Sequence, residues 1–206
     1  MNLKQLKARV TYQTILLAAY ALIASALLGV ADLNTRDVIK LRQEEDLKAS
    51  LVQVVPAELF DNDLVKDAVA VPADSDLGTG ETLVYLARKQ GEITAAAFQL
   101  TAPDGYSGNI KMIMGLNRNG EVLGVRVIAH AETPGLGDKI EVSKSDWILN
   151  FNGRSIHNLT VKEWAVKKDG GIFDQFSGAT ITPRAVVNTI YKGLLFFDKH
   201  KSELFN

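Results

Sequence analysis

The sequence predicts an α+β protein: a single N-terminal transmembrane helix followed by an extracytoplasmic antiparallel-sheet domain with flanking helices. Three observations support this fold class. A long stretch near the N-terminus has no charged residue, the middle of the chain alternates short apolar runs with turn residues, and the chain closes on an amphipathic helical pattern. With 206 residues and a hydrophobic fraction of 47%, the chain is large enough for one domain with a core plus an appendage.

The composition excludes several classes of protein. With 23 basic and 24 acidic residues the net charge is −1, whereas nucleic-acid binders present a basic face, so we expect no nucleic-acid partner. The chain has no cysteine and therefore supplies no disulfide and no thiolate ligand to zinc or to an iron–sulfur cluster. Its three histidines, His130, His157 and His200, are far apart in the sequence. We expect no metal site and no catalytic residue.

The uncharged stretch covers residues 10–31, VTYQTILLAAYALIASALLGVA. As a helix rising about 1.5 Å per residue, it would span roughly 33 Å, which matches the hydrocarbon core of a bilayer. Asp32 follows the stretch, and three basic residues precede it: Lys4, Lys7 and Arg9. The positive-inside rule therefore predicts that residues 1–9 stay in the cytoplasm and that the rest of the chain lies outside, in the periplasm of a bacterium.

A cleaved signal peptide is the alternative interpretation of this stretch. Residues 24–26, Ala-Ser-Ala, form an acceptable cleavage site. The apolar run continues past that site to Val30, which is longer than a typical signal core. We therefore favour an uncleaved anchor that contacts membrane lipid.

Residues 32–56 predict a juxtamembrane stalk helix, and residues 57–206 the extracytoplasmic domain. Asn34 or Thr35 is a suitable N-cap for the stalk, and Pro56 ends it. Apolar residues recur in it at three- and four-residue steps: Val38, Leu41, Leu47, Leu51 and Val54 or Val55. The Asp-, Gly- and Pro-rich stretch 60–80 is expected to be an irregular connection.

Four segments then follow with the pattern of strands, at residues 82–89, 93–100, 109–117 and 121–130. The turns between them read QGE, APDGYSG and RNG, and the pair Asn119-Gly120 is a strong hairpin signal. Because consecutive strands joined by short turns pair with each other, the series predicts an antiparallel meander.

Three elements are expected after the meander. A short helix fits residues 143–151, with Ser143 or Ser145 as its cap and Trp147 on its buried face. A strand is expected at residues 163–168, before a turn at 169–171. The last helix is expected to start with Thr182 as N-cap and Pro183 at its first position, and to bury one apolar face: Ala185, Val186, Ile190, Leu194 and Phe197.

The loop before this last helix has the composition of an anion site. Thr180 comes two residues before the expected cap, so a phosphate there would face the positive end of the helix dipole and its free N–H groups. Gly178 and Ala179 allow the backbone to approach a bulky group. Many helices begin after a small-residue loop, however, and from these residues alone a plain helix entry is the more common case.

The stretch SGATIT, residues 177–182, resembles the flavin-attachment motif of the FMN-binding domain family found in bacterial electron-transport complexes. Three longer stretches carry the same resemblance: Trp164–Val187, His130–Ile140 and Thr101–Gly108. Together with the membrane anchor, the resemblance covers nearly the whole chain. It is closest to the G subunits of Rnf complexes, which are called Rsx complexes in enteric bacteria.

In that family a threonine hydroxyl forms a phosphoester with FMN, and the attachment threonine corresponds to Thr180. The resemblance thus implies one covalent FMN per chain, with Ser177, Gly178, Ala179 and Thr182 around the attachment point. In the family, a separate flavin transferase uses FAD and a metal ion to form the bond. A threonine hydroxyl is a poor nucleophile at neutral pH, and no base stands beside Thr180 in the sequence, which agrees with an external enzyme.

The second glycine-containing stretch, ETPGLGD, is a turn by its residues alone. By resemblance it packs near the flavin ring, and four of its residues are expected to line the site: Glu132, Thr133, Gly135 and Leu136. We interpret His130 as structural. Trp147 and Trp164 either stack on the ring or pack in the core, and core packing is favoured. Lys167 and Lys168 either neutralise the phosphodiester or are simply solvated.

The resemblance implies a membrane-anchored flavoprotein of the bacterial inner membrane, with residues 57–206 as its periplasmic FMN-binding domain. It would relay electrons within a redox-driven ion pump that links ferredoxin and NAD, or that keeps a redox-sensing regulator reduced. The protein would act as a subunit of a translocase and not as an independent catalyst. Its implied partners are the membrane and iron–sulfur subunits of the complex, the flavin transferase and lipid.

Two alternatives stay open. The C subunit of the sodium-translocating NADH:quinone oxidoreductase carries a similar domain, although that protein is usually longer. A noncatalytic membrane-anchored assembly module would instead use SGAT as a mere helix entry. In either case the chain lacks the strand–Gly-rich turn–helix fingerprint of an NAD site. The anchor has no ionisable residue that could form an ion path.

Overall fold

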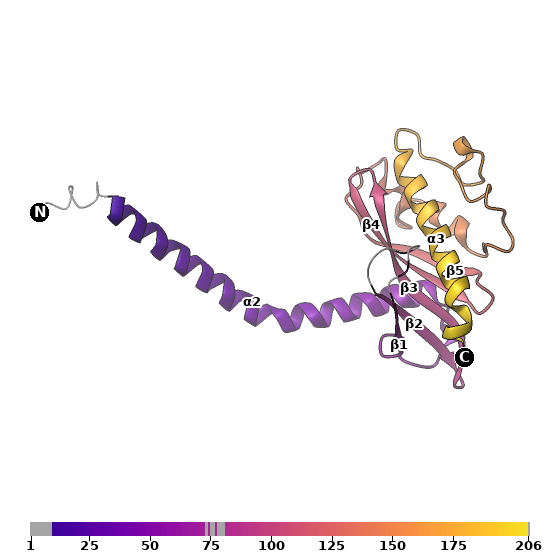
Figure 1. The fold of residues 1–206 in the computed structure, drawn as a ribbon, viewed down its shortest axis with the longest axis horizontal. Coiled ribbons are helices and arrows are strands. Elements are labelled where there is room, and N and C mark those ends of the chain that lie inside the picture. The colour runs from indigo at the N-terminus through magenta and orange to yellow at the C-terminus, as the bar shows by residue number, and fades with distance from the viewer. Residues whose placement is uncertain (1–9, 73, 75–76, 78–80, 206) are drawn as a thin grey trace, which may run out of the picture. The chain divides into compact units, whose positions relative to one another are not determined.

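The computed structural model describes residues 10–72, 74, 77 and 81–205. The chain divides into two units, Met1–Asp46 and Leu47–Asn206, and each is described by itself. The second unit contains a five-stranded antiparallel sheet and a long C-terminal helix, which confirms the predicted α+β class (Figure 1). The predicted cytoplasmic segment, residues 1–9, lies outside the described residues, as does part of the expected irregular connection at 60–80.

Helix α2, Val10–Val54, is one continuous helix of 45 residues. The expected stalk is thus helical up to Val54, but it continues the preceding helix, so the predicted N-cap at Asn34 or Thr35 is wrong. Both side chains donate to carbonyls one turn earlier, with Asn34 Nδ2 2.9 Å from Val30 O and Thr35 Oγ1 2.9 Å from Ala31 O. Neither side chain therefore caps a helix start, and the helix runs through both residues. The helix ends two residues before Pro56, as expected.

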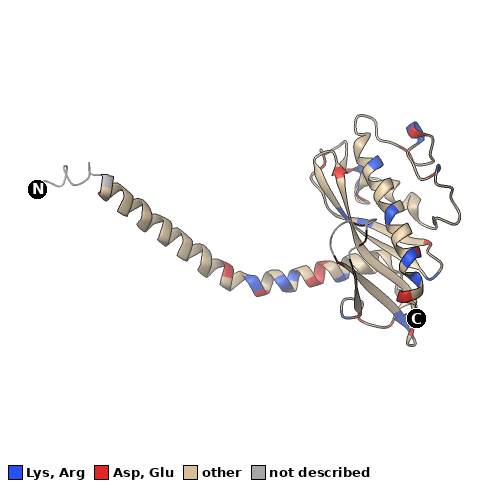
Figure 2. Ribbon diagram, in the orientation of Figure 1, with Lys and Arg blue, Asp and Glu red and all other residues tan. Residues whose placement is uncertain are grey.

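The first part of α2 has the properties of a membrane span. Among the described residues, one helix is long and apolar enough to cross a bilayer, with a mean hydropathy of 2.2 in its most apolar window. Figure 2 shows that charged residues begin along the helix only after a long uncharged stretch. That stretch is the one identified from the sequence, and Asp32 is the first acidic residue after it.

The sheet is a simple meander in the order β1-β2-β3-β4-β5, with every neighbouring pair antiparallel, as predicted. Its strands are β1 Ala68–Val71, β2 Thr82–Lys89, β3 Glu92–Gly105, β4 Gly108–Asn117 and β5 Val122–Ala129.

Two details of the meander differ from the prediction. Strand β1 lies inside the stretch expected to be irregular. Strand β3 continues to Gly105, which pairs with Gly108, so the expected loop at 102–108 shrinks to a tight hairpin tip. The turn-forming residues Pro103, Asp104 and Gly105 made Ala102 look like part of a loop in the sequence. In the structure Ala102 is fully buried in the core.

Both faces of the sheet are covered. One side of β3 directs Ala96, Phe98 and Leu100 into the larger core, which contains the buried face of helix α3, Ile181–Leu204. The alternate residues Ala95 and Ala97 enter a second core with the end of α2. A strand buried on both faces has a continuous apolar sequence, which explains why ITAAAFQL lacks polar alternation.

The end of α2 rests directly on a pair of glycines in the sheet. Gly115 of β4 and Gly124 of β5 are register partners. A Cβ on Gly115 would lie 2.2 Å from Val54 O, and one on Gly124 would lie 3.1 Å from Val54 Cα. The two glycines therefore allow helix backbone to approach strand backbone more closely than any side chain would permit.

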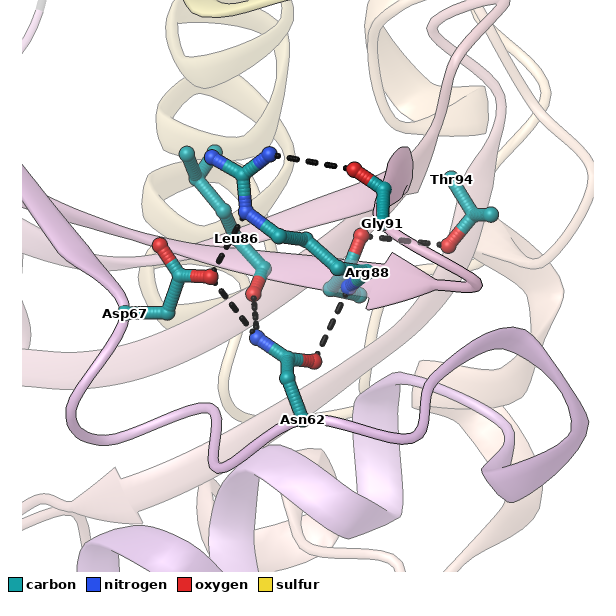
Figure 3. A network of polar contacts seen from close by, with 7 residues as sticks. Asn62, Asp67, Leu86, Arg88, Gly91 and Thr94 are labelled. Atoms are coloured by element: carbon teal, nitrogen blue, oxygen red, sulfur yellow. Dashed lines mark hydrogen bonds and ion pairs between the residues drawn. The ribbon is translucent and has the colours of Figure 1, made fainter.

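The segment after α2 is fastened to β2 by polar contacts (Figure 3). Asn62 accepts from Arg88 N–H through Oδ1 and donates through Nδ2 to Leu86 O, both at 2.9 Å. Arg88 Nε lies 2.7 Å from Asp67 Oδ2, which also accepts from Asn62. This network supplies the partners that an irregular backbone needs where it crosses a sheet edge.

Between β5 and α3 the chain has little regular structure. It contains three short 3-10 turns: Asp138–Ile140, Asp146–Phe151 and Lys167–Asp169. The second replaces the expected helix at 143–151, and Ser145 caps it by accepting from Trp147 N at 3.2 Å. The expected strand at 163–168 is wrong, because only Val166 makes a bridge, to Phe173, before the third turn begins.

Aromatic packing holds this irregular segment together. Three rings pack against one another in it: the centroid of Phe151 is 4.4 Å from that of Phe173 and 6.3 Å from that of Trp164, and the last two are 5.4 Å apart. Trp147 contacts Phe151 and Phe176 edge to face, and its indole N–H donates to Asp174 O at 2.8 Å. Both tryptophans are buried, so the preference for core packing is confirmed.

Helix α3 begins at Ile181, and the residue in its N-cap position is Thr180. The predicted cap at Thr182 with Pro183 in the first helical position is therefore wrong, since Thr182 and Pro183 are the second and third helical residues. The hydroxyl of Thr182 bonds to a distant side chain instead of the helix terminus. The predicted apolar face is confirmed, because Ala185, Val186, Ile190, Leu194 and Phe197 are all buried.

Candidate functional site

The loop before α3 is a tight turn that leads directly into the helix. Ala179 N–H donates to Phe176 O at 3.2 Å, and Gly178 between them has φ +80°, the left-handed value that the third residue of a type II turn requires. Thr180 follows at the N-cap position, half-buried, and its side chain makes no capping hydrogen bond. Its hydroxyl is therefore not used to terminate the helix.

A second turn lies beside the first. Leu136 N–H donates to Thr133 O at 3.1 Å across Pro134 and Gly135, and Gly135 has φ +77°. Proline second and a left-handed glycine third are the preferences of a type II turn. Gly135 is thus needed for the chain reversal that brings Leu136 and Gly137 back toward Thr133.

Glu132 joins the two turns and the hairpin tip between β3 and β4. Its side chain is buried, with 4% of the residue exposed. Oε1 accepts from Ser107 N–H at 3.0 Å, and Oε2 accepts from the Thr182 hydroxyl. A Cβ on Gly137 would lie 2.9 Å from both Cβ and Oε2 of Glu132, so the glycine provides the space that the carboxylate occupies.

These three segments enclose a cavity of about 320 Å³. Seven of the nine site residues predicted from the sequence line it: Glu132, Thr133, Leu136, Gly178, Ala179, Thr180 and Thr182. The lining does not include Ser177, which is exposed on the turn, or Gly135, which shapes the neighbouring turn. Tertiary structure thus brings together two sequence stretches that are about fifty residues apart.

Three further residues, which the sequence analysis did not single out, also line the cavity: Tyr106, Gly137 and Ile181. Tyr106 lies within the stretch Thr101–Gly108, one of the three that carried the resemblance, so a signal for it was present. Its position could not be predicted from the sequence, because the hairpin tip is adjacent to the loop that contains Thr180 only in the folded state.

The cavity wall is neutral except for Glu132. No lysine, arginine or histidine belongs to the described lining, and the positive end of α3 supplies the electrostatic attraction for an anion. Lys167 lies 2.6 Å from Asp174, and Lys168 N–H donates to Gln175 Oε1 at 3.3 Å. Neither lysine lines the cavity, and both instead contact the segment that precedes the turn at Phe176–Ala179.

An ion pair and a hydrogen-bonded pair flank the site. Arg184, in the first turn of α3, contacts both carboxylate oxygens of Asp169, and this hydrogen bond lowers the pKa of Asp169 and raises that of Arg184. His130 accepts from Glu132 N–H through Nδ1 and lies 2.7 Å from Glu141 Oε1 through Nε2. That hydrogen bond, with a smaller contribution from Ser143, lowers the pKa of Glu141.

The contacts of His130 define which ring nitrogen carries its proton. Because Nδ1 accepts the Glu132 amide proton, Nε2 carries the ring proton and donates it to Glu141. His130 thereby fixes the backbone at the start of the Glu132–Gly137 turn. Within the described residues, no group of three or more histidine, aspartate or glutamate side chains is arranged to hold a metal ion.

Comparison with known proteins identifies related sequences over most of the chain. The family described as "FMN-binding domain" matches residues 105–194, from the hairpin tip at Gly105 to the middle of α3. The chain is also similar to three proteins that are each named as the G subunit of an ion-translocating oxidoreductase complex. The protein from Shewanella oneidensis is 47% identical over 193 residues, covering 93% of this chain and 91% of the relative.

The other two relatives give comparable figures. The protein from Cereibacter sphaeroides is 50% identical over 190 residues, covering 92% of this chain and 85% of the relative. The one from Aliivibrio fischeri is 46% identical over 192 residues, covering 93% and 91%. In all three cases the alignment extends well beyond the domain that contains the cavity.

Proposed function

Because the chain belongs to the family of G subunits of ion-translocating oxidoreductase complexes, and its cavity lies within a matched FMN-binding domain, we propose that Thr180 carries FMN as a covalent phosphoester. The protein is a membrane-anchored flavoprotein of the Rnf complex, and its redox role is that of a subunit. In this proposal it holds one flavin and relays electrons between neighbouring subunits.

The observation that carries the proposal is the contrast among the three hydroxyls near the start of α3. Thr182 is fully buried and its hydroxyl is donated to Glu132. Ser177 is exposed on the turn outside the cavity lining. Thr180 and Thr182 both line the cavity, but only the Thr180 hydroxyl makes no capping hydrogen bond and is not donated to Glu132. Thr182 therefore cannot replace Thr180 as the attachment point without breaking a buried hydrogen bond.

The cavity fits a flavin phosphate and part of its ring. Its volume of about 320 Å³ falls within the ordinary range of small-molecule sites. The peptide N–H groups at the start of α3 and the helix dipole would face the phosphate, and Gly178 leaves the backbone uncovered there. Leu136 and Ile181 provide apolar surface beside it.

In the proposed attachment, Thr180 Oγ1 forms a bond to the FMN phosphorus of FAD while the anhydride bond of FAD breaks, AMP leaves, and the hydroxyl proton is lost. The one acidic side chain among the described lining residues, Glu132, is buried and already accepts hydrogen bonds from Ser107 and Thr182. In this proposal the base is supplied by a separate flavin transferase. The bound flavin supplies the redox chemistry, and this chain supplies position and shielding.

The wider assembly is part of the same proposal. The named relatives are subunits of a complex, so membrane and iron–sulfur subunits would donate and accept the electrons, coupled to ion transport. Within the described residues, the anchor provides a single span, and the chain would act as a relay and not as an independent catalyst. The relatives carry the name of a G subunit and not that of the C subunit of the quinone-linked enzyme, and the matched flavin domain disfavours a mere assembly module.

The test uses the full chain produced together with a flavin transferase. The unaltered protein is expected to gain the mass of one FMN and to show a fluorescent band under UV on a denaturing gel. Thr180→Ala should lose both signals, whereas Ser177→Ala, which changes a hydroxyl outside the cavity, should keep both. Covalent flavin on the Thr180→Ala protein would show that the attachment assignment is wrong.

A further inference from the structure

The tip of the β3–β4 hairpin presents an aromatic side chain at the rim of the cavity. Tyr106 is 67% exposed although it is a large, mostly apolar residue, and it lines the same cavity as Thr180. It has no role in either apolar core of the domain. An exposed aromatic ring beside a ligand cavity is typical of a contact that is completed by the ligand.

The tip is held in place by its backbone and not by the tyrosine ring. Ser107 N–H donates to the buried Glu132 carboxylate at 3.0 Å. A Cβ on Gly105 would lie 2.2 Å from Gly108 O and 2.9 Å from Glu132 Oε1, so the chain is closely packed there. Gly108 has φ +118°, which a residue with a side chain rarely adopts. The backbone of Tyr106 is therefore fixed at the rim while its side chain extends freely.

The residues that share the rim with Tyr106 define the chemistry of the occupant. Leu136 is 41% exposed and Ile181 45% exposed, and both line the cavity. The described lining has no basic side chain that would attract a second anionic group. This rim suits a flat, uncharged aromatic ring system, which gains contact area from apolar side chains and stacking from the phenol.

A second cavity of about 400 Å³ lies on the other side of Ile181 and is the competing position for a ring. Trp164 and the Asp169–Arg184 ion pair line it. Thr180 does not belong to its lining, and Trp164 already packs against Phe151, Phe173 and Tyr191 within the core. A group attached at Thr180 therefore enters the cavity bordered by Tyr106 more directly.

We propose that Tyr106 is the aromatic wall of the flavin site and stacks on the isoalloxazine ring of the FMN attached at Thr180, with Glu132 holding the hairpin tip in position. This inference rests on the proposed attachment at Thr180. It adds a contact residue from a part of the chain about seventy residues before the attachment motif.

The test is flavin fluorescence in the full, covalently loaded chain. A phenol in contact with an excited flavin quenches it by electron transfer, and an alkyl side chain cannot. Tyr106→Leu keeps an apolar side chain at the tip and should raise the fluorescence yield several-fold and remove the shortest lifetime. Tyr106→Trp should keep the emission quenched, because indole is also an electron donor.

Two controls separate the contact from general effects. Val161→Ala changes a side chain that is 71% exposed and absent from both cavity linings, and it should leave the emission unchanged. Covalent flavin per chain, measured by intact mass, should be the same in Tyr106→Leu as in the unaltered protein. Because Tyr106 is exposed and belongs to neither core, its replacement should leave the fold intact.

The outcomes distinguish this inference from the attachment itself. Unchanged emission from Tyr106→Leu, with full covalent loading, overturns the stacking contact and leaves the attachment at Thr180 intact. A rise in emission with Trp164→Phe in place of Tyr106→Leu also overturns it, because the ring would then occupy the second cavity. If the unaltered chain carries no covalent flavin, both the attachment and this contact are wrong.

Discussion

The Thr182 hydroxyl donates a hydrogen bond to the buried carboxylate of Glu132, joining residues that are 50 positions apart in the chain. Thr182 is fully buried, and the other oxygen of Glu132 accepts from the hairpin tip at Ser107. This one carboxylate therefore connects the start of α3, the Glu132–Gly137 turn and the β3–β4 hairpin. All three surround the cavity that contains Thr180.

Replacing Thr182 with valine tests this connection. Valine has nearly the shape of threonine but no donor, so Glu132 Oε2 would stay buried without its partner, at a cost of about 1–3 kcal/mol. We expect the free energy of unfolding to fall by this amount in urea titrations of the full chain in detergent, followed by tryptophan fluorescence. Thr182→Ser keeps the hydroxyl and should lose less. Equal stability of the valine and serine variants would contradict the proposed importance of the bond.

The His130–Glu141 pair gives a pH dependence with a definite sign. The hydrogen bond from His130 lowers the pKa of Glu141 below its ordinary value of 4.5. A carboxylate whose pKa is lowered by folding stabilises the folded state above its unfolded pKa, and this contribution is lost as the pH falls through the folded pKa. The unaltered protein should therefore be more stable than Glu141→Gln at neutral pH.

The measurement is the difference in Tm between the unaltered chain and Glu141→Gln, from about pH 7 down to about pH 3. We expect the difference to shrink as the pH falls below the usual carboxylate range. Because the Glu141 side chain is 36% exposed, the effect at neutral pH should be modest. A difference that stayed constant across this range would exclude titration of Glu141 as its source.

The orientation of the chain is predicted by its basic N-terminal residues and its uncharged span. A reporter enzyme that is active only outside the cytoplasm, fused after the last residue, should be active in cells. Replacing Lys4, Lys7 and Arg9 together should reduce the fraction of correctly oriented protein. Activity of a cytoplasm-specific reporter at the same fusion point would reverse the assigned topology.

Local sequence signals located the regular elements well. The Asn119-Gly120 hairpin and strand β2 were predicted from turn chemistry and from apolar patterning, and both depend on nearby residues. The same approach failed for the expected strand at 163–168, because EWAVKK alternates as a strand does while Trp164 and Val166 in fact pack into an irregular aromatic cluster. It also missed β1, whose four residues become a strand only by pairing with β2.

The cap of α3 illustrates the limit of local rules. Thr182-Pro183 matches the preferred start of a helix, yet the helix begins at Ile181 and the Thr182 hydroxyl bonds to Glu132. A buried carboxylate gains more from that donor than an exposed helix terminus does, since a buried acceptor without a partner has lost its water. Tertiary context therefore overrode the local preference.

The sequence by itself determined the uncharged span, the meander, the apolar face of the last helix and the small-residue loop that contains Thr180, because each depends on residues close together in the chain. Only the tertiary structure decided which hydroxyl is available, which side chains surround it, and that Tyr106 stands at its rim. These relationships join segments that are distant in the sequence, and no periodicity encodes them. They arise because the buried charge of Glu132 must find hydrogen-bond donors, and folding brings Ser107 and Thr182 to it.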